Sequence, residues 1–180
     1  GAVVNMIHPL LSSAQIESFI KKTNSSVILI LDQIYPKIAD IQWKNHKMPK
    51  IILTRIIDSL PLYIKPAYTV INKVNISINP VHDYLYWNNF LLQSKSKNII
   101  LPEDNGKMDD VAIIMYSGGT TGDPKGVMLT NLNINSYAIQ AFEVSGVQEP
   151  KGKKFLAILP LFHGFGFASG IHANLCKGVH

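Results

Sequence analysis

The sequence predicts an α/β protein in which a mostly parallel sheet is flanked by helices. Two runs of β-branched and aliphatic residues, 26–31 and 111–116, lack polar alternation, which is typical of strands buried on both faces of a parallel sheet. Helical patterns lie between the strand patterns along the chain, as in βαβ units. The 180 residues are 47% hydrophobic and 16% charged, which is a globular composition with enough length for one domain with a core.

The first third of the chain gives the clearest elements. Ser12 and Gln15 have the spacing of a capping box, which predicts a helix with an apolar face that ends near residue 22. The strand at 26–31 follows it. A proline inside 32–41 limits where the next short helix begins, so that helix is expected within this range.

The rest of the chain continues the alternation less clearly. A strand is predicted at 50–54, and three prolines between 56 and 82 break any long element there. Asp83 is placed to cap a helix that runs to about residue 94, and the strand at 111–116 then leads into a glycine-rich loop. The apolar stretch 155–171 contains a proline, a histidine and three glycines, so we expect a buried strand followed by a turn and not a bilayer span.

Charge and cysteine content exclude some classes of protein. The formal net charge is +5, but Arg55 is the only arginine and the lysines are scattered, which disfavours a nucleic-acid partner. Cys176 is the only cysteine, so no disulfide forms within the chain, and a reducing, cytoplasmic location is expected. We interpret Cys176 as an ordinary buried thiol without a Cys or His at metal-ligand spacing, and no metal site is predicted.

The segment "YSGGTTGDPKG", residues 116–126, has the chemistry of a phosphate-binding loop. Four of its eleven residues are glycines, whose backbone N–H groups can turn toward one anion, and it adds hydroxyl donors and one lysine. A short Gly/Ser run alone would be an ordinary turn, but this ordering after a strand favours phosphate binding. The usual P-loop is excluded because its Gly-Lys-hydroxyl triplet is missing. The predicted phosphate ligands are Ser117, Gly118, Gly119, Thr120, Thr121, Gly122 and Lys125.

The loop resembles the signature of the adenylate-forming superfamily, which includes acyl-CoA synthetases, luciferases and peptide-synthetase adenylation domains. It departs from that pattern at Ser117, where the family has Thr, and at Gly118, where the family has Ser; the Gly is similar to the long-chain fatty-acyl-CoA synthetase variant. Asn131 replaces the family's His after the loop, and Thr130 or Asn131 can still cap the following helix. Two further segments also resemble family regions. One is "LPLFHGFG" at 159–166, and the other is the opening, residues 1–38, which is similar to the long-chain synthetase region where a strand leads to an Asn-Pro loop, a helix and a strand.

The resemblance implies a reaction in two steps. A carboxylic acid attacks Mg-ATP to give an acyl-adenylate, and the thiol of CoA then displaces AMP. The resemblance to long-chain synthetases implies that the acid is a fatty acid. The implied cofactors are ATP, Mg²⁺ and CoA, and the implied catalytic residues are Lys125 on the phosphates and His163 beside the carboxylate. His172 lies outside the motif and has no assigned role.

The same resemblance implies that residues 1–180 are a partial N-terminal AMP-binding domain. The upstream part, the rest of that domain and the C-terminal domain with its catalytic lysine have no counterpart in these residues. We therefore expect that the chain alone cannot complete adenylation, and that the isolated chain self-associates through uncovered sheet edges. A long-chain acid would imply peripheral membrane contact, although no segment shows it.

Three alternatives stay open from the residues alone. The acid could be an aryl, amino or short-chain acid, because most pocket residues are not in this chain. The chain could instead be a non-enzymatic nucleotide-binding module or a pseudoenzyme, against which the intact Thr120, Thr121 and Lys125 argue. A P-loop kinase or ATPase is disfavoured by Pro124 and Gly126, which flank the lysine.

Overall fold

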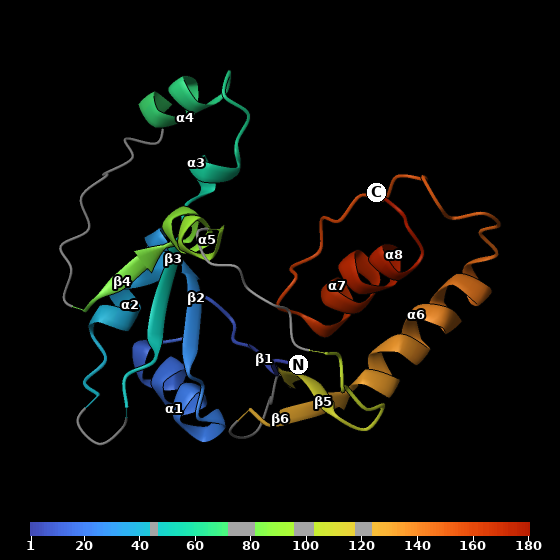
Figure 1. Ribbon diagram of the computed structural model, residues 1–180, viewed down its shortest axis with the longest axis horizontal. Coiled ribbons are helices and arrows are strands. Elements are labelled where there is room, and N and C mark those ends of the chain that lie inside the picture. The colour runs from blue at the N-terminus through green and yellow to red at the C-terminus, as the bar shows by residue number, and fades with distance from the viewer. Residues whose placement is uncertain (44–46, 72–81, 96–102, 118–123) are drawn as a thin grey trace. The chain divides into compact units, whose positions relative to one another are not determined.

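The computed structural model describes residues 1–43, 47–71, 82–95, 103–117 and 124–180, and it confirms the α/β fold class (Figure 1). The chain divides into two compact units, Gly1–His8 with Glu103–His180, and Pro9–Pro102. We call these the hairpin unit and the parallel unit. The sequence predicts one partial domain over 1–180, and that assignment stays a prediction.

The parallel unit is built on a three-stranded sheet in the order β2-β3-β4, with all strands parallel. Its register pairs Ile28 with Ile51 and Leu53 with Tyr86. Helices and strands of this unit are α1 Ser13–Thr23, β2 Val27–Leu31, the 3₁₀ turn η1 Asp32–Ile34, α2 Tyr35–Ala39, β3 Lys50–Thr54, α3 Ile56–Ser59, α4 Lys65–Ile71, β4 Tyr84–Tyr86 and α5 Trp87–Lys95.

The core of the parallel unit lies around α1, α2 and β3. The predicted capping box of α1 is present, since Ser12 Oγ accepts from Gln15 N at 3.3 Å and Gln15 Oε1 accepts from Ser12 N at 3.1 Å. Its predicted apolar face is buried, as expected for an amphipathic helix on a core. The buried apolar residues of the unit are Ile16, Phe19, Ile20, Tyr35, Ile38, Ile41, Ile51, Ile52 and Leu53.

Two predictions for this unit are wrong in detail. The strand at 26–31 is not buried on both faces, because β2 lies at the sheet edge and Leu29 is 57% exposed. The helix expected directly after an Asp83 cap begins instead at Trp87, because Tyr84–Tyr86 pairs with β3 as a strand. A side chain that suits a helix cap was outweighed by tertiary strand pairing.

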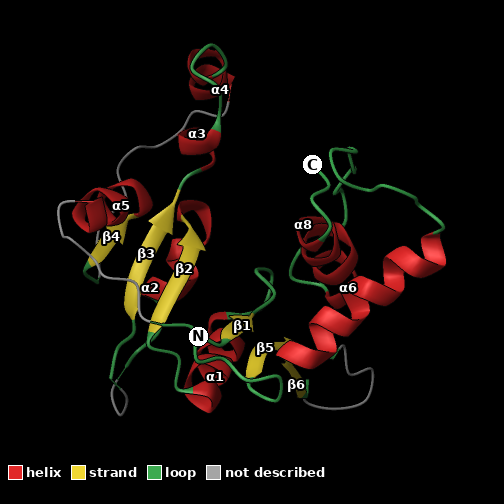
Figure 2. Cartoon of the chain, turned by 45° about the vertical axis from the view of Figure 1, so that its right-hand side comes forward, coloured by secondary structure: helices red, strands yellow, loops and turns green. Residues whose placement is uncertain are grey.

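The hairpin unit contains a second three-stranded sheet, in the order β1-β5-β6 (Figure 2). β1 is parallel to β5, whereas β5 and β6 are antiparallel. The unit's elements are β1 Val4–Met6, β5 Val111–Tyr116, β6 Gly126–Thr130, α6 Asn131–Ser145, α7 Gly164–Phe167, the π-helix η2 Ala168–His172 and α8 Ala173–Cys176. The predicted Thr130 cap of α6 is present as a capping box with Asn133.

The last thirty residues differ from the prediction of a buried strand and a turn. Residues 155–161 form no strand, and apolar side chains such as Leu156, 76% exposed, lie on the surface. The helical segment α7-η2-α8 follows, and its η2 and α8 parts pack against α6. Cys176 is exposed and not buried, and its Sγ lies 3.6 Å from His172 Nε2, so a His does stand four residues before it on the helix. No helix in the described ranges is long and apolar enough to span a bilayer.

Candidate functional site

The glycine-rich loop connects the two antiparallel strands of a β-hairpin. Tyr116 pairs with Gly126 across the ends of β5 and β6, and Ser117 N donates to Lys125 O at 3.0 Å beyond this pair. The two loop ends are therefore held side by side. The side chains of Ser117 and Lys125 are both exposed at this position, and no salt bridge among the described residues involves Lys125.

Most of the predicted phosphate ligands lie outside the described residues. This applies to Gly118, Gly119, Thr120, Thr121 and Gly122. Their neighbours at the hairpin end are described, and Gly126 shows why a glycine stands there. A Cβ on Gly126 would lie 3.2 Å from Ile114 Cγ2 and 3.3 Å from Tyr116 Cε1, so the close approach of the two strands favours a residue without a side chain.

Tyr116 anchors the start of the loop to the sheet. Burial raises the pKa of its phenol, and a hydrogen bond to Asn5 on β1 partly opposes that rise. The phenol oxygen is buried, and a raised pKa keeps it neutral. Tyr116 is thus a partly buried neutral phenol at the start of the loop.

His163 is held at the start of α7 by its backbone and by its ring. Its N–H donates to Pro160 O at 3.1 Å, and its Nδ1 accepts from Phe165 N at 3.4 Å as the helix cap. An accepting Nδ1 leaves the hydrogen of the neutral imidazole on Nε2, which is then free to donate to a ligand. The side chain is exposed.

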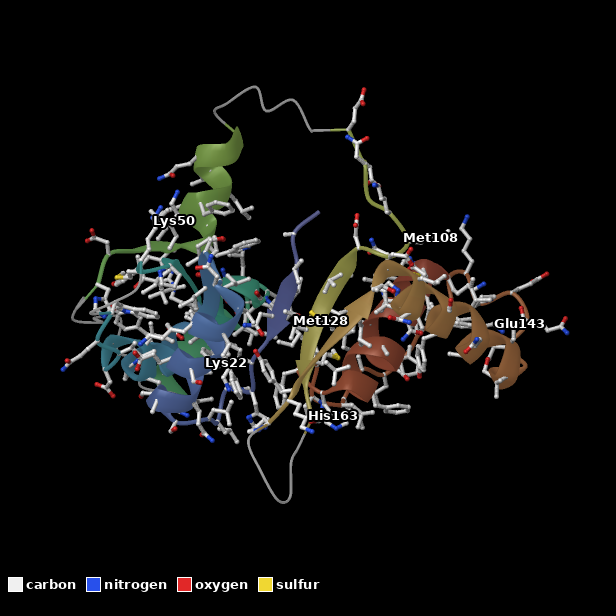
Figure 3. The ribbon with its side chains drawn as sticks, turned by 90° about the horizontal axis from the view of Figure 1, so that it is seen from below. Lys22, Lys50, Met108, Met128, Glu143 and His163 are labelled. Atoms are coloured by element: carbon white, nitrogen blue, oxygen red, sulfur yellow. The ribbon has the colours of Figure 1, made fainter. Side chains whose placement is uncertain are left out.

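The turn that carries His163 packs against β5. A Cβ on Gly164 would lie 3.5 Å from Met115 Sδ, one residue before Tyr116. Figure 3 shows His163 beside the hairpin strands. The structure thus brings together three of the predicted residues, Ser117, Lys125 and His163, at one end of the β1-β5-β6 sheet.

Gly166 fixes the same turn from the other side. A Cβ there would lie 2.1 Å from Pro160 O and 2.8 Å from Pro160 C, so the α7 backbone rests directly on the Pro160 carbonyl. Gly166 is buried, and this contact leaves no room for a side chain.

Sequence reasoning missed one histidine at this end of the sheet. His8 follows β1, whose Met6 is paired with Met115 of β5, and its ring lies 4.2 Å from the Phe162 ring between centroids, tilted by 58°. The parallel pairing of β1 with β5 places His8 at the same sheet end as Ser117. The residue is exposed and lies over 150 positions from Phe162 in sequence, so no local pattern could have found it.

The arrangement suits an anion. A hydroxyl, an ammonium and an imidazole come from separate segments and are exposed at a sheet end from which a glycine-rich loop departs. Such donors hold phosphate groups by charge-assisted hydrogen bonds, each contributing about 1.5–3 kcal/mol. Within the described ranges, no group of three His, Cys, Asp or Glu side chains is placed to hold a metal.

Comparison with known proteins gives a consistent result. The family described as AMP-binding enzyme matches residues 1–180. A long-chain-fatty-acid–CoA ligase of Bacillus subtilis is 30% identical over 182 residues, which cover 99% of this chain and 32% of that protein. A 4-coumarate–CoA ligase-like protein of Arabidopsis thaliana is 41% identical over 81 residues, covering 43% of this chain and 14% of the relative.

The fold is also found among solved structures. The structure of a red-emitting luciferase from Phrixothrix hirtus is similar with a TM-score of 0.71 and 19% identity, covering 98% of this chain and 30% of that one. At that identity the likeness concerns the fold alone. The chain thus spans about a third of the length of the proteins that it matches along its whole length.

Proposed function

Because the chain belongs to the AMP-binding enzyme family, we propose that the protein carrying it activates a carboxylic acid with ATP to an acyl-adenylate and then transfers the acyl group to CoA. The observation that carries this proposal is the β5–β6 hairpin, which holds Ser117 and Lys125 at the two ends of the glycine-rich loop. The chain supplies the phosphate-binding loop and part of the acid site. The complete reaction is proposed for the whole protein, and we propose that the 180 residues alone bind the nucleotide without turnover.

The proposed roles follow from where charge develops. In the attack of a carboxylate on the α-phosphorus, negative charge builds on the phosphorus oxygens and on the leaving pyrophosphate. Lys125 and the loop donors, Ser117 among them, would hold the β- and γ-phosphates. His163 would donate from Nε2 to the acid or the adenylate. Mg²⁺, when bound with ATP, would neutralise charge on the phosphates.

A fatty acid is the proposed substrate class. Support comes from the Bacillus subtilis long-chain-fatty-acid–CoA ligase, which matches 99% of this chain, and from Gly118, which resembles the long-chain form of the loop. An aryl acid is the second candidate, favoured by the shorter but more similar match to the 4-coumarate–CoA ligase-like protein. A cytoplasmic location with peripheral membrane contact remains part of the fatty-acid proposal.

The test is acid-dependent exchange of labelled pyrophosphate into ATP by the whole protein, with fatty acids of several lengths and with aryl and amino acids. Lys125→Ala removes one charge-assisted bond, so we expect exchange to fall about ten- to a hundredfold, which corresponds to roughly 1.5–3 kcal/mol. Lys154→Ala is the matched control, because Lys154 is an exposed lysine of the same unit outside the site.

Each outcome decides between the alternatives. The fatty-acid proposal would be supported if the protein exchanges with long-chain acids, and if Lys125→Ala reduces this exchange while Lys154→Ala does not. Exchange with aryl acids alone would favour the second candidate. A folded protein that binds Mg-ATP but exchanges with no acid would overturn the enzymatic proposal and favour a non-enzymatic nucleotide-binding module. Nucleotide binding unchanged by Lys125→Ala would show that the loop does not hold the phosphates.

Self-association of the isolated 180 residues is proposed separately. The exposed apolar side chains at 155–161, including Leu156 at 76% and Ile158 at 73%, support it because surfaces of this kind are normally covered. Sedimentation velocity at increasing concentration tests it, and a single monomer at every concentration would contradict it.

A further inference from the structure

We propose that His8 is a positioning residue of the acid site, acting through Phe162 on His163. The proposal rests on the proposed function for its catalytic consequence, but its structural part can be tested without any activity. Nothing in the sequence pattern or in the comparisons assigns a role to His8. Three observations carry the proposal: its ring contact, its place after β1, and the way the His163 turn is held elsewhere.

The first observation is the contact itself. The imidazole of His8 packs against the Phe162 ring with a centroid separation of 4.2 Å and a tilt of 58°. Tilted ring pairs attract one another beyond the area that they bury, so the contact favours one position of the Phe162 ring. Phe162 directly precedes His163, so a contact that fixes the Phe162 ring restricts the backbone from which the His163 side chain departs.

The second observation is the connection of His8 to the loop. β1 and β5 are parallel and in register from Val4 with Ile113 to Met6 with Met115. His8 stands two residues after this pairing and Ser117 stands two residues after Met115. The same parallel pair therefore sets the positions of both His8 and Ser117.

The third observation is that the His163 turn has no other side-chain contact of this kind among the contacts described. The turn is held to α7 by the His163 Nδ1 cap and by the bond from Phe167 N to His163 O at 2.9 Å. These bonds fix His163 relative to α7 and not relative to the sheet. On the sheet side, the Met115 side chain of β5 lies near Gly164. The His8–Phe162 ring contact adds a side-chain link from the end of β1 to the turn.

The consequence is a selective effect on the acid. Loss of the His8 ring frees Phe162, and His163 then samples positions away from the hairpin end. A reacting group displaced by about 1 Å can lose up to a hundredfold in rate. Ser117 and Lys125 belong to the hairpin and keep their places, so binding of ATP is expected to change little.

The experiment compares three proteins: the whole wild-type protein, His8→Ala and His8→Phe. His8→Ala removes the ring, and we expect the KM for the acid in pyrophosphate exchange to rise about tenfold, with the KM for ATP changed less than about twofold. His8→Phe restores the ring without the imidazole nitrogens, and it is expected to return the acid KM to within about twofold of wild type. Equal loss in His8→Ala and His8→Phe would overturn the positioning role, because the nitrogens and not the ring would then matter.

A second readout does not depend on turnover. The imidazole ¹H–¹³C signals of His163, assigned by a His163→Gln variant, report its environment directly. We expect these signals to shift or broaden in His8→Ala and to match wild type in His8→Phe. Unchanged His163 signals in a folded His8→Ala protein would overturn the proposal. If the wild type exchanges with no acid while His163 still responds to His8→Ala, the proposed function has failed and the positioning role stands.

Discussion

The two sheets end differently at the carboxyl ends of their strands. After β3 of the parallel unit, Arg55 donates to both carboxylate oxygens of Asp58, from Nε at 3.0 Å and from Nη2 at 2.8 Å. The same guanidinium lies 4.7 Å from the Tyr86 ring centroid. The hydrogen bond to Asp58 raises the pKa of Arg55, while partial burial opposes the rise. At this end of the sheet, the charged side chains of Arg55 and Asp58 therefore pair with each other.

The hairpin unit leaves the corresponding end of its sheet open. His8 follows β1, Ser117 follows β5, and Lys125 precedes β6, and all three side chains are exposed. The carboxyl ends of strands in α/β proteins are the usual place for ligands. The two units thus differ in how exposed the side chains at these strand ends are: Ser117 and Lys125 are exposed, whereas Arg55 and Asp58 bond to each other. Exposed donors at a strand end are what the proposed phosphate site requires.

The largest expected effect is on the core of the parallel unit. Leu53 is fully buried in β3, so Leu53→Ala is expected to lower the free energy of unfolding by about 2–5 kcal/mol. Both tryptophans, Trp43 and Trp87, lie in this unit, so the urea midpoint of tryptophan fluorescence measures it. Leu29→Ala on the neighbouring strand is the control, because that side chain is 57% exposed.

If the parallel unit is a scaffold, Leu53→Ala leaves pyrophosphate exchange per folded molecule unchanged. If folded Leu53→Ala loses as much exchange as Lys125→Ala does, the parallel unit is not merely a scaffold, and the two sheet ends do not differ in function.

The next largest effect is expected at Gly166 in the hairpin unit. Gly166→Ala places a Cβ about 2.1 Å from Pro160 O, and overpacking of this kind costs about 1–3 kcal/mol. The Met115 methyl signal, followed by NMR during urea titration, measures this unit because Met115 is buried in β5. We also expect the rate of pyrophosphate exchange to fall, and by more than the loss of folded protein accounts for, because the His163 turn moves.

Gly170→Ala is the matched control for Gly166→Ala. A Cβ at Gly170 would lie 3.8 Å from Leu161 Cδ2, which is an ordinary contact. This variant should keep or slightly raise stability, since alanine is favoured over glycine in helices by up to about 1 kcal/mol. Equal destabilisation by both substitutions would show that the close approach of Gly166 to Pro160 is not the cause.

Local patterns predicted the parts of the fold that depend on neighbouring residues. The Ser12–Gln15 box, the Thr130 cap and the strands at 50–54 and 111–116 all follow from sequence within a few residues. The parts that failed depend on distant pairing. Three residues at Tyr84–Tyr86 are too few to show a strand period, and their assignment is decided by β3.

The candidate site shows the same limit. The loop motif and His163 could be named from sequence because each belongs to a recognisable local segment. The β6 strand was missed because antiparallel pairing with β5 is not visible in "GVMLT" itself. His8 was missed because its partner, Phe162, meets it only in the folded hairpin unit. The apolar composition of 155–161 predicted a buried strand, but these side chains are largely exposed. Composition alone does not determine which part of a protein covers an apolar segment.

The two capping boxes, one in each unit, allow a smaller test of whether the parallel unit and the hairpin unit unfold separately. Ser12→Ala in the parallel unit and Thr130→Ala in the hairpin unit each remove one cap, which costs about 0.5–2 kcal/mol. We expect Ser12→Ala to shift the tryptophan midpoint and Thr130→Ala to shift the Met115 midpoint. If each variant shifted both midpoints equally, the units would unfold together and the two sheets could not be treated as separate scaffolds.

The smallest expected effect is the pH dependence contributed by Tyr116. Burial raises its pKa in the folded protein above the ordinary tyrosine value of about 10. The stabilising contribution of the neutral phenol is therefore complete below about pH 10 and is lost as the pH rises through the folded pKa, because the unfolded chain ionises first. Tyr116→Phe removes this term, so the difference in unfolding free energy between wild type and variant should shrink above about pH 10, measured on the Met115 methyl signal.

Tyr84→Phe is the control, because Tyr84 also has a raised pKa but lies in the parallel unit. It should leave the pH dependence of the Met115 signal unchanged. A wild type and a Tyr116→Phe variant that lose stability in parallel through this range would mean that Tyr116 titrates alike in both states, and that the phenol is not the buried anchor of the open sheet end.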